Sequence, residues 1–375
     1  MAASFLARRQ QSQNLAAIPD SLSAWAQESA PTGNVVFHDV RGLEVANWLQ
    51  GLWYRRSPWH ALLLPLSLLF GLLAALRRGL YRARLLPSVK LPVPVVVVGN
   101  IAVGGTGKTP LVLWLAHFLR TQGWRPGIVS RGYGASATLP HAVTPHGNPL
   151  QSGDEPLLLA RRSGCPVWVG RDRAATGRAL LKAHPDCNVL LCDDGLQHYR
   201  LRRDVEIAVI DGARGCGNGF LLPAGPLRES VKRLQTVDAV AVNGGTGQDG
   251  YAMTLCGTLF RNLADASRTA QAQDFRGLRL HAVAGIGNPQ RFFDHLRGLG
   301  LECATRAFPD HHAYRAEDLA FAGTDPLLMT EKDAVKCAAF AAPAWWALAV
   351  EAQVDAALGE RLLEKLRKTN GCQTA

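Results

Sequence analysis

Short apolar runs that alternate with amphipathic stretches are the main pattern of this chain. The runs are rich in valine, leucine and isoleucine and stop at glycine or at charged residues, which is typical of buried strands. Apolar residues at helical spacing follow several of them. We therefore expect strands at 95–98, 127–130, 167–169, 188–194, 205–210 and 237–242. Strands that alternate with helices predict an α/β fold with a doubly wound, mostly parallel sheet, whose functional site lies at the carboxyl ends of the strands.

A change in composition divides the chain near residue 250. Residues 244–250 are mainly glycine with glutamine and aspartate, and the hydrophobic pattern stays weak until residue 272. An apolar run at 280–284 then opens a second series of strands and helices. We therefore expect a larger domain at 91–250, a linker at 251–275 and a smaller C-terminal α/β domain at 276–375, which includes a helix at 358–366.

Two different segments precede the larger domain. Residues 1–42 are rich in alanine, glutamine and serine without strong periodicity, so we interpret them as a weakly ordered extension. Residues 43–90 contain the uncharged apolar run 61–76, which is shorter than the ~20 residues that span a bilayer. Arginines flank this run on both sides, and aromatic residues precede it. The pattern favours a membrane-associating helix in the plane of the cytoplasmic leaflet, with its arginines at the headgroups; a buried core helix and a membrane span are the alternatives.

A glycine-rich loop joins the run at 95–98 to an apolar helix, and it reads Val-Gly-Gly-Thr-Gly-Lys-Thr from residue 103. In this strand–loop–helix order the glycine N–H groups face nucleotide phosphates, Lys108 reaches the outer phosphates and the Thr109 hydroxyl binds Mg²⁺. Ala102 stands where the usual pattern has glycine. We predict a P-loop, with a turn that binds no phosphate as the alternative. The predicted loop comprises Ile101, Ala102, Val103, Gly104, Gly105, Thr106, Gly107, Lys108 and Thr109.

Carboxylates mark three further positions of the larger domain. The strand at 188–194 ends in Asp193 and Asp194, as in Walker-B sites, where such a carboxylate completes the Mg²⁺ shell beside the P-loop. A plain strand-end aspartate is the alternative. Asp154 lies in an acidic turn that leads into a helix, so capping that helix is its simplest role. A loop rich in glycine and proline, residues 217–229, ends in Arg228 and Glu229.

The charge balance narrows the class of ligand. The 41 lysines and arginines outnumber the 30 aspartates and glutamates, and the formal net charge is +11. A basic surface favours an anionic partner such as phosphates, a nucleic acid or an anionic membrane face. The 8 cysteines show no C-x-x-C and no zinc-like spacing, so we interpret them as reduced thiols of a cytosolic protein.

Several ordered motifs resemble those of the tetraacyldisaccharide 4′-kinase family of lipid A biosynthesis. Together they cover nearly everything from residue 43 onward, while residues 1–42 fall outside the family pattern. Ala102 also matches the usual loop of this family. The matching stretches are Trp53-Tyr, Val95-Val-Val-Val-Gly-Asn, Ser130-Arg-Gly-Tyr-Gly, Gly153-Asp-Glu-Pro, Asp193-Asp-Gly-Leu-Gln-His-Tyr-Arg-Leu201, Leu222-Pro-Ala-Gly-Pro-Leu-Arg-Glu229, His281-Ala-Val-Ala-Gly-Ile-Gly-Asn-Pro-Gln-Arg-Phe-Phe293, Asp310-His and Met329-Thr-Glu-Lys-Asp-Ala-Val-Lys-Cys337.

The resemblance implies a peripheral or monotopic enzyme at the cytoplasmic face of the bacterial inner membrane, with no nucleic acid as partner. Its substrates would be ATP, bound with Mg²⁺, and an acylated glucosamine disaccharide 1-phosphate. The 4′-hydroxyl of the sugar would receive the γ-phosphate and give the bis-phosphorylated lipid A precursor. The implied fold is a P-loop kinase domain joined through a two-stranded linker to a smaller α/β domain.

The resemblance also assigns roles to individual residues. Asp154 would be the catalytic base, with His311 rather than His312 oriented against it, because the motif needs only the first histidine after Asp310. A sugar hydroxyl is poorly acidic, so an aimed carboxylate must accept its proton as the phosphoryl group transfers. Lys108 would bind the phosphates and Thr109 the Mg²⁺, and the surroundings of metal and nucleotide would include Asp193, Asp194 and Glu229.

Charge neutralisation at the transferring phosphate calls for cations besides Lys108. Arg131, Arg171 and Arg228 are candidates, although a solvated surface arginine is the commoner case for any one of them.

Three other classes of protein fit the sequence less well. A GTPase would need N-K-x-D, but in Thr330-Glu-Lys-Asp-Ala334 the aspartate follows the lysine directly. A ligase or partitioning ATPase on the same fold would not need the apolar helix before the P-loop. A membrane scaffold with a degenerate nucleotide site is disfavoured because the phosphate-binding lysine, the threonine and the paired aspartates are all present.

Overall fold

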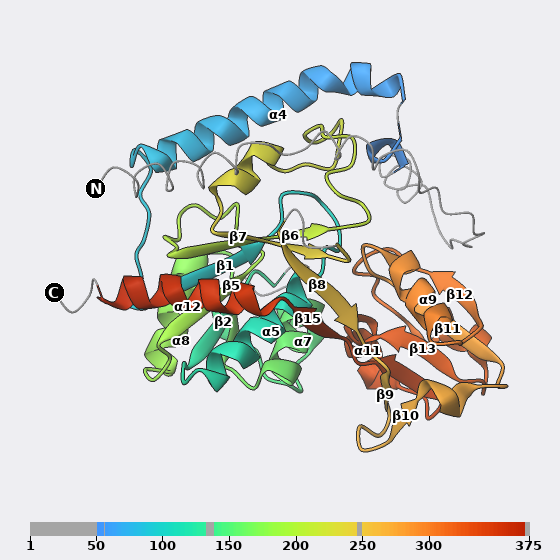
Figure 1. The fold of residues 1–375 in the computed structure, drawn as a ribbon. Coiled ribbons are helices and arrows are strands. Elements are labelled where there is room, and N and C mark those ends of the chain that lie inside the picture. The colour runs from blue at the N-terminus through green and yellow to red at the C-terminus, as the bar shows by residue number, and fades with distance from the viewer. Residues whose placement is uncertain (1–50, 56, 133–138, 246–249, 372–375) are drawn as a thin grey trace, which may run out of the picture.

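Two sheets organise the protein (Figure 1). The computed structural model describes residues 51–55, 57–132, 139–245 and 250–371, so the extension expected at 1–42 lies outside it. Within these residues the larger sheet has nine strands in the order β15-β8-β7-β6-β1-β5-β2-β4-β3, and the smaller sheet has six in the order β10-β9-β14-β13-β11-β12.

The larger sheet is parallel from β8 through to β4, and only its two edge strands, β15 and β3, pair antiparallel. The mostly parallel sheet predicted from the sequence is therefore confirmed. Its strands are β1 (Val95–Gly99), β2 (Pro126–Ser130), β3 (His141–Ala142), β4 (Val167–Val169), β5 (Val189–Asp193), β6 (Val205–Asp211), β7 (Ala239–Asn243), β8 (Tyr251–Cys256) and β15 (Glu351–Val354).

Helices cover both faces of this sheet. Val96 and Val98 of β1 belong to the apolar cluster under one set of helices, whereas Val95 and Val97 belong to the cluster on the other face. Because both faces are covered, the strands are continuous apolar runs rather than alternating ones. The first face carries α5 (Lys108–Thr121), α7 (Asp154–Ser163) and α12 (Ala356–Gly371), and the second carries α8 (Arg173–Ala183) and the 3-10 helix η1 (Val231–Thr236); a short helix, α6 (Pro149–Ser152), precedes α7.

The smaller sheet is parallel from β14 to β12 and has an antiparallel edge made of β9 and β10. Helix α9 covers one face with Phe292, Phe293 and Leu296, and α10, η3 and α11 cover the other. The strands are β9 (Leu259–Asn262), β10 (Thr269–Gln271), β11 (Leu280–Ala284), β12 (Cys303–Ala307), β13 (Leu327–Thr330) and β14 (Trp345–Leu348); the helices are η2 (Ala272–Phe275), α9 (Pro289–Gly298), α10 (Ala316–Leu319), η3 (Ala320–Ala322), α11 (Glu331–Cys337) and η4 (Ala338–Phe340).

The antiparallel pair of β8 and β15 connects the two sheets, as the resemblance implied for a two-stranded linker. The division of the chain differs from the expected one in two places. Residues 251–256, expected in the linker, form a strand of the larger sheet. Strand β15 and helix α12, expected within the smaller domain at 276–375, return to the larger domain, where Leu358, Leu362 and Leu366 are buried in its core. The apolar stripe of a helix does not reveal which sheet it covers.

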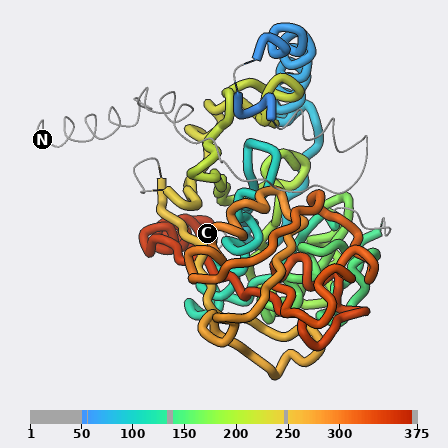
Figure 2. Tube along the Cα trace, turned by 90° about the vertical axis from the view of Figure 1, so that its right-hand side faces the viewer, coloured from blue at the N-terminus to red at the C-terminus, as the bar shows by residue number. Residues whose placement is uncertain are grey.

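Helix α4 (Trp59–Arg82) stands apart from both sheets (Figures 1 and 2). Along its 24 residues only His60 and Ser67 are buried. Most of its leucines are exposed, so a buried core helix, one of the three alternatives, is contradicted. In the described part of the chain it is the one helix long and apolar enough to cross a membrane.

The 217–229 loop holds α4 to the larger domain. The hydroxyl of Ser67 donates to the carbonyl of Leu221 at 2.7 Å, and Trp53 Nε1 donates to the carbonyl of Pro223 at 3.0 Å. A Cβ atom on Gly71 would lie 2.6 Å from Leu221 Cδ1, so the helix approaches the loop closely at this glycine. The same loop reaches the P-loop, which brings α4 close to the nucleotide site.

Candidate active site

The P-loop lies after β1, near the middle of the larger sheet. Gly104 and Gly107 have φ values of 115° and 95°, which disfavour any side chain. Two strand-end asparagines hold the loop from within: Asn100 Nδ2 donates to the Gly104 carbonyl at 3.3 Å, and Asn243 Nδ2 donates to the Thr106 carbonyl at 3.0 Å. Asn100 closes the family motif that begins at Val95, but neither asparagine was predicted to have this role.

The beginning of the P-loop pairs with the 217–229 loop. The N–H of Val103 donates to the carbonyl of Pro226 at 2.8 Å, and the N–H of Arg228 donates to the carbonyl of Ile101 at 2.6 Å. Ala102 forms a bridge with Leu227 and is buried against it. Ala102 does not have a positive φ, so this position does not require glycine.

Lys108 and Arg228 converge on Asp194. Lys108 Nζ lies 3.7 Å from Oδ1 of this aspartate, and Arg228 Nη1 lies 3.3 Å from Oδ2. Burial raises the pKa of Asp194, but the two cations outweigh burial and hold the pKa below its usual range. Asp194 therefore stays ionised and holds the lysine at the mouth of the P-loop.

Asp193 has a buried carboxylate oxygen that lacks a hydrogen-bond partner in the part of the chain that the structure describes and is suited to bind a metal ion. The carboxyl group is buried, and only Oδ2 has a partner, the Ser130 hydroxyl at 3.4 Å; Oδ1 has no hydrogen-bond partner among the described residues. Burial, with the nearby Glu155, raises the pKa of Asp193 to about 7. A buried carboxylate oxygen without a donor, at the end of the strand next to β1 and near the charge of Lys108, fits Mg²⁺, which prefers oxygen ligands. No cluster of three or more acidic, histidine or cysteine side chains suited to a metal occurs in the described ranges, as expected where phosphates supply most ligands.

Glu229 is occupied by other side chains. Gln197 Nε2 donates to its Oε1 at 2.8 Å, and the Tyr199 hydroxyl donates to Oε2. Arg233 Nε lies 3.4 Å and Arg78 Nη1 3.6 Å from Oε2. These partners leave little room for a metal ion, so the geometry favours Glu229 as a support that joins α4 to the end of β5.

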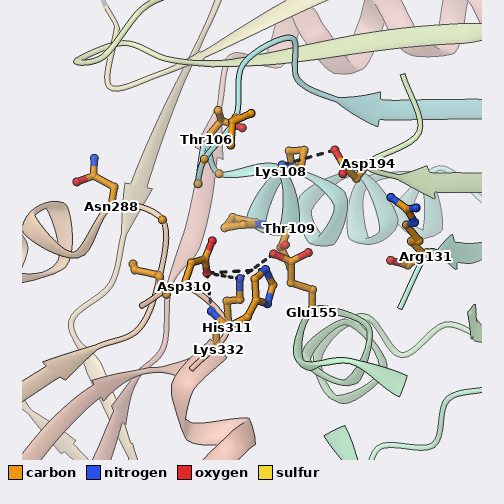
Figure 3. A pocket seen from close by; sticks show the side chains of 18 of the residues that line it. Thr106, Lys108, Thr109, Arg131, Glu155, Asp194, Asn288, Asp310, His311 and Lys332 are labelled. Atoms are coloured by element: carbon orange, nitrogen blue, oxygen red, sulfur yellow. Dashed lines mark hydrogen bonds and ion pairs between the residues drawn. The ribbon is translucent and has the colours of Figure 1, made fainter. Parts of the chain in front are cut away.

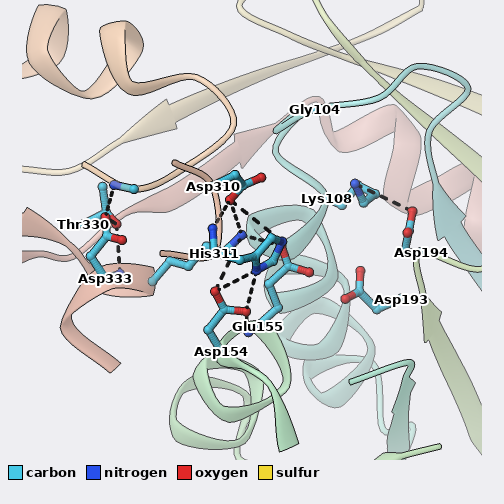
Figure 4. Close-up of polar contacts among 12 residues, drawn as sticks. Gly104, Lys108, Asp154, Glu155, Asp193, Asp194, Asp310, His311, Thr330 and Asp333 are labelled. Atoms are coloured by element: carbon cyan, nitrogen blue, oxygen red, sulfur yellow. Dashed lines mark hydrogen bonds and ion pairs between the residues drawn. The ribbon is translucent and has the colours of Figure 1, made fainter. Parts of the chain in front are cut away.

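Asp154 and His311 meet across the two domains, as expected from the sequence (Figure 4). Asp154 is the first residue of α7, and its Oδ2 lies 3.0 Å from His311 Nδ1. His311 has a φ of 61°, in the left-handed region. His312 instead pairs with Asp318, with its Nε2 at 3.0 Å from Oδ2. The structure thus brings Asp154 together with His311 and not with His312.

The resemblance implied that Asp154, oriented by His311, acts as the base, but the positions of the two residues relative to the cavity favour the reverse. His311 lines the central cavity, whereas Asp154 is only 6% exposed and lies behind it. Burial raises the pKa of Asp154, but the hydrogen bond from His311 and the charge of Lys332 outweigh it, and the pKa falls to about 2. Burial lowers the pKa of His311, but the hydrogen bond to Asp154 outweighs it and the pKa is raised. A carboxylate with so low a pKa is a weak base, and the cavity-facing imidazole is the better one.

The wall around His311 contains charged residues that the sequence analysis missed. Glu155, Asp310 and Lys332 all line the cavity beside it (Figure 3). Glu155 follows Asp154 and Asp310 precedes His311 in the sequence, and this adjacency could have identified them. Lys332 lies in a stretch that matches a motif of the resembled family and was compared with a GTPase motif, but neither comparison gave this lysine a role.

The cavity occupies about 1280 Å³ between the two domains and α4. Phe70, Leu73 and Ala74 of α4 form an apolar part of its wall, and the P-loop forms another part. The three candidate arginines all line it, together with three that were not predicted; these six are Arg131, Arg171, Arg228, Arg77, Arg173 and Arg291. The cavity thus has cations for phosphates and an apolar side next to α4.

The turn after β11 closes the cavity above the P-loop. A Cβ atom on Gly287 would lie 2.4 Å from the backbone nitrogen of Gly105, so the two backbones touch. Arg214 Nη1 donates to the Gly287 carbonyl at 2.8 Å, and Arg291 Nη2 lies 2.5 Å from Asp211 Oδ1. The smaller domain is thereby held against the nucleotide loop.

Comparisons with known proteins agree with this arrangement. A family model described as Tetraacyldisaccharide-1-P 4′-kinase matches residues 59–367. The tetraacyldisaccharide 4′-kinase of Methylobacillus flagellatus is 52% identical over 328 residues, 87% of this chain and 98% of the relative. That of Dechloromonas aromatica is 56% identical over 333 residues, 86% of this chain and 98% of the relative. A solved structure of LpxK from Aquifex aeolicus in complex with ATP is 28% identical, with a TM-score of 0.69 over 82% of this chain and 99% of that chain.

Proposed function

The chain belongs to the tetraacyldisaccharide-1-phosphate 4′-kinase family. We propose that His311, held by Asp154, accepts the proton of the hydroxyl group that the kinase phosphorylates. The protein uses ATP to phosphorylate the 4′-hydroxyl of tetraacyldisaccharide 1-phosphate in lipid A biosynthesis. The observation that carries the proposal is the contact of His311 Nδ1 with Asp154 Oδ2 at 3.0 Å, at the wall of the cavity that contains Lys108.

This geometry determines where the proton of the sugar hydroxyl goes. Asp154 accepts the N–H of Nδ1 and so leaves the other ring nitrogen, Nε2, as the acceptor. As the sugar oxygen bonds to the γ-phosphorus and the bond to the ADP oxygen breaks, the hydroxyl proton passes to Nε2. The imidazolium that forms is stabilised by the ionised Asp154, which raises the proton affinity of the ring.

The P-loop positions the phosphates. Backbone N–H groups from Gly104 to Lys108 bind them, and Lys108 reaches the transferred group. Asp194 holds this lysine in place and also pairs with Arg228, which supplies a second cation for the phosphates. Thr109 and Asp193 would hold Mg²⁺, which when bound neutralises charge on the phosphates. Glu229 keeps a supporting role in this proposal.

The lipid reaches the cavity along α4. The outer leucines of this helix would lie in the cytoplasmic leaflet of the inner membrane, and Phe70, Leu73 and Ala74 on its inner side would contact acyl chains of the substrate. Arg82 in the last turn of α4 would lie at the headgroups. The phosphate of the acceptor would meet the cavity arginines.

The proposal is tested by comparing His311→Ala with His312→Ala. We expect His311→Ala to lower kcat by roughly 10²–10⁴ with detergent-dispersed tetraacyldisaccharide 1-phosphate, because it removes a general base. Its ATP affinity, measured by calorimetry, should stay close to that of the wild type. His312→Ala should lose little activity, since its ring contacts Asp318 and Phe308 rather than Asp154. Equal turnover in the two variants would remove His311 from the reaction.

A further inference from the structure

We propose that Lys332 is a positioning residue for this reaction, which draws three carboxylates of the two domains together beside His311 and keeps the ring able to accept a proton. The inference rests on the proposed role of His311.

Lys332 lies at the centre of a charge cluster that crosses the domain boundary (Figure 3). Its Nζ is 2.9 Å from Glu155 Oε1 and 3.9 Å from Asp154 Oδ2, both on α7 of the larger domain. It is also 3.0 Å from Asp310 Oδ1, in the loop of the smaller domain that carries His311. The side chain is 14% exposed, so these contacts are largely screened from water.

The backbone under Lys332 is fixed from several sides. Thr330 caps α11 by accepting the N–H of Asp333 at 3.1 Å, and Asp333 accepts the N–H of Gly285 at 3.0 Å. Glu331, next to Lys332, forms an ion pair with Arg162 of α7. Lys332 is thus held at one end of an anchored helix and points across the boundary, as a positioning residue must.

The charges around His311 explain what Lys332 does. The groups that face the ring and Lys332 are Asp154 and Glu155 from α7, Asp310 from the adjoining loop, and Lys332 itself from α11. Without the lysine, three carboxylates would face one another beside the imidazole. They would hold the ring in its protonated form, in which it cannot act as a base, and Asp310 would repel Glu155 across the boundary.

The directions of the pKa shifts agree with this. Burial lowers the pKa of Lys332, but the carboxylates of Glu155, Asp154 and Asp310 outweigh it and raise the pKa, so the lysine stays charged. Its charge in turn lowers the pKa of His311, against the upward effect of Asp154. The two neighbours of the ring therefore act in opposite directions on its proton affinity.

The test is the pH dependence of kcat/KM in purified full-length protein with ATP, Mg²⁺ and detergent-dispersed tetraacyldisaccharide 1-phosphate. In Lys332→Met we expect the acidic limb of the profile to move to higher pH by about one unit, the usual scale for loss of a neighbouring charge. Activity lost at pH 7 should largely return near pH 8.5. Lys332→Arg, which keeps the charge, should restore the wild-type position. Lys365→Met, which breaks the ion pair of Lys365 on α12 with Asp238, is the matched control and should not move the limb.

Asp310→Asn provides the opposite change and is useful if Lys332→Met folds poorly. The asparagine keeps the oxygen that accepts the N–H of His311, but it removes one negative charge, so the limb should move to lower pH. A loss of activity that is uniform across pH in Lys332→Met, or a limb that stays in place in both variants, overturns the inference. If His311→Ala retains full activity, the proposed function fails instead, whatever the Lys332 variants do.

Discussion

His311 Nδ1 lies 3.0 Å from Asp154 Oδ2, although the two residues belong to different domains and are 157 positions apart. The pair exists only while the loop after β12 lies against the start of α7. The packing of the two domains against each other is therefore needed to assemble the group that accepts the proton. The same packing places Gly287 against the P-loop, so the nucleotide loop and the base both depend on how the smaller domain packs on the larger one.

Asp154→Ala should leave ATP affinity nearly unchanged and lower kcat by roughly 10²–10⁴, because the ring loses the carboxylate that orients it and raises its proton affinity. Adding His311→Ala to this variant should cost little more, since residues that act as one unit give strongly non-additive losses. Steady-state kinetics of the two single variants and the double variant measure this. Multiplicative losses would mean that Asp154 and His311 act independently.

The strands of the larger domain and the P-loop were predictable because both are local patterns. An apolar run such as Val95 to Val98 is visible wherever a strand is buried on both faces. Asp193 and Asp194 follow such a run and could therefore be placed next to the P-loop. The pairing of Asp154 with His311 came from the resemblance, because no local pattern connects two residues so far apart.

Other features could not be read from the sequence because they depend on tertiary contacts. Leu358, Leu362 and Leu366 form an apolar stripe that fits either sheet. The sequence therefore placed α12 in the smaller domain, whereas it packs on the larger one. Which of Asp154 and His311 faces the cavity is a matter of burial after folding. Lys332 and Glu155 are 177 positions apart, and only the docking of α11 on α7 brings their charges together.

Asp193 should make the stability of the protein depend on pH and on Mg²⁺. Its pKa is raised to about 7 in the folded protein, above ~3.9 for an unfolded aspartate. The stability that this carboxyl contributes is therefore fully present below pH ~3.9 and is lost as the pH rises through about 7. With EDTA present, Tm should fall by a few °C more between pH 6 and pH 8 in the wild type than in Asp193→Asn.

Mg²⁺ with ADP should restore Tm of the wild type at pH 8, because the metal ion would compensate the buried charge, and should do so far less in Asp193→Asn. Differential scanning calorimetry measures both effects. Asp294→Asn, on an exposed part of α9, is the matched control and should behave as the wild type does. An equal response to Mg²⁺ in all three proteins would show that Asp193 does not contact the metal.

The outer leucines of α4 should bind the membrane. Leu68 and Leu72 are 72% and 65% exposed and are one turn apart on the helix. Replacing both with glutamate puts two charges into the acyl region and should abolish co-flotation with vesicles of phosphatidylethanolamine and phosphatidylglycerol. Leu278→Glu changes an exposed leucine of the smaller domain and should leave flotation unchanged. If the doubly charged protein still floats, the membrane contact lies elsewhere.

Gly287→Ala should weaken ATP binding more than it slows the chemical step. The added methyl group would lie 2.4 Å from the backbone nitrogen of Gly105, and neither backbone can move aside without disturbing the P-loop. Overpacking of this kind costs typically 1–3 kcal/mol, so KM for ATP should rise about tenfold or more. Gly298→Ala is the matched control, because a Cβ at the end of α9 meets no atom within 4 Å. An unchanged KM in Gly287→Ala would mean that the contact of Gly287 with the P-loop does not influence ATP binding.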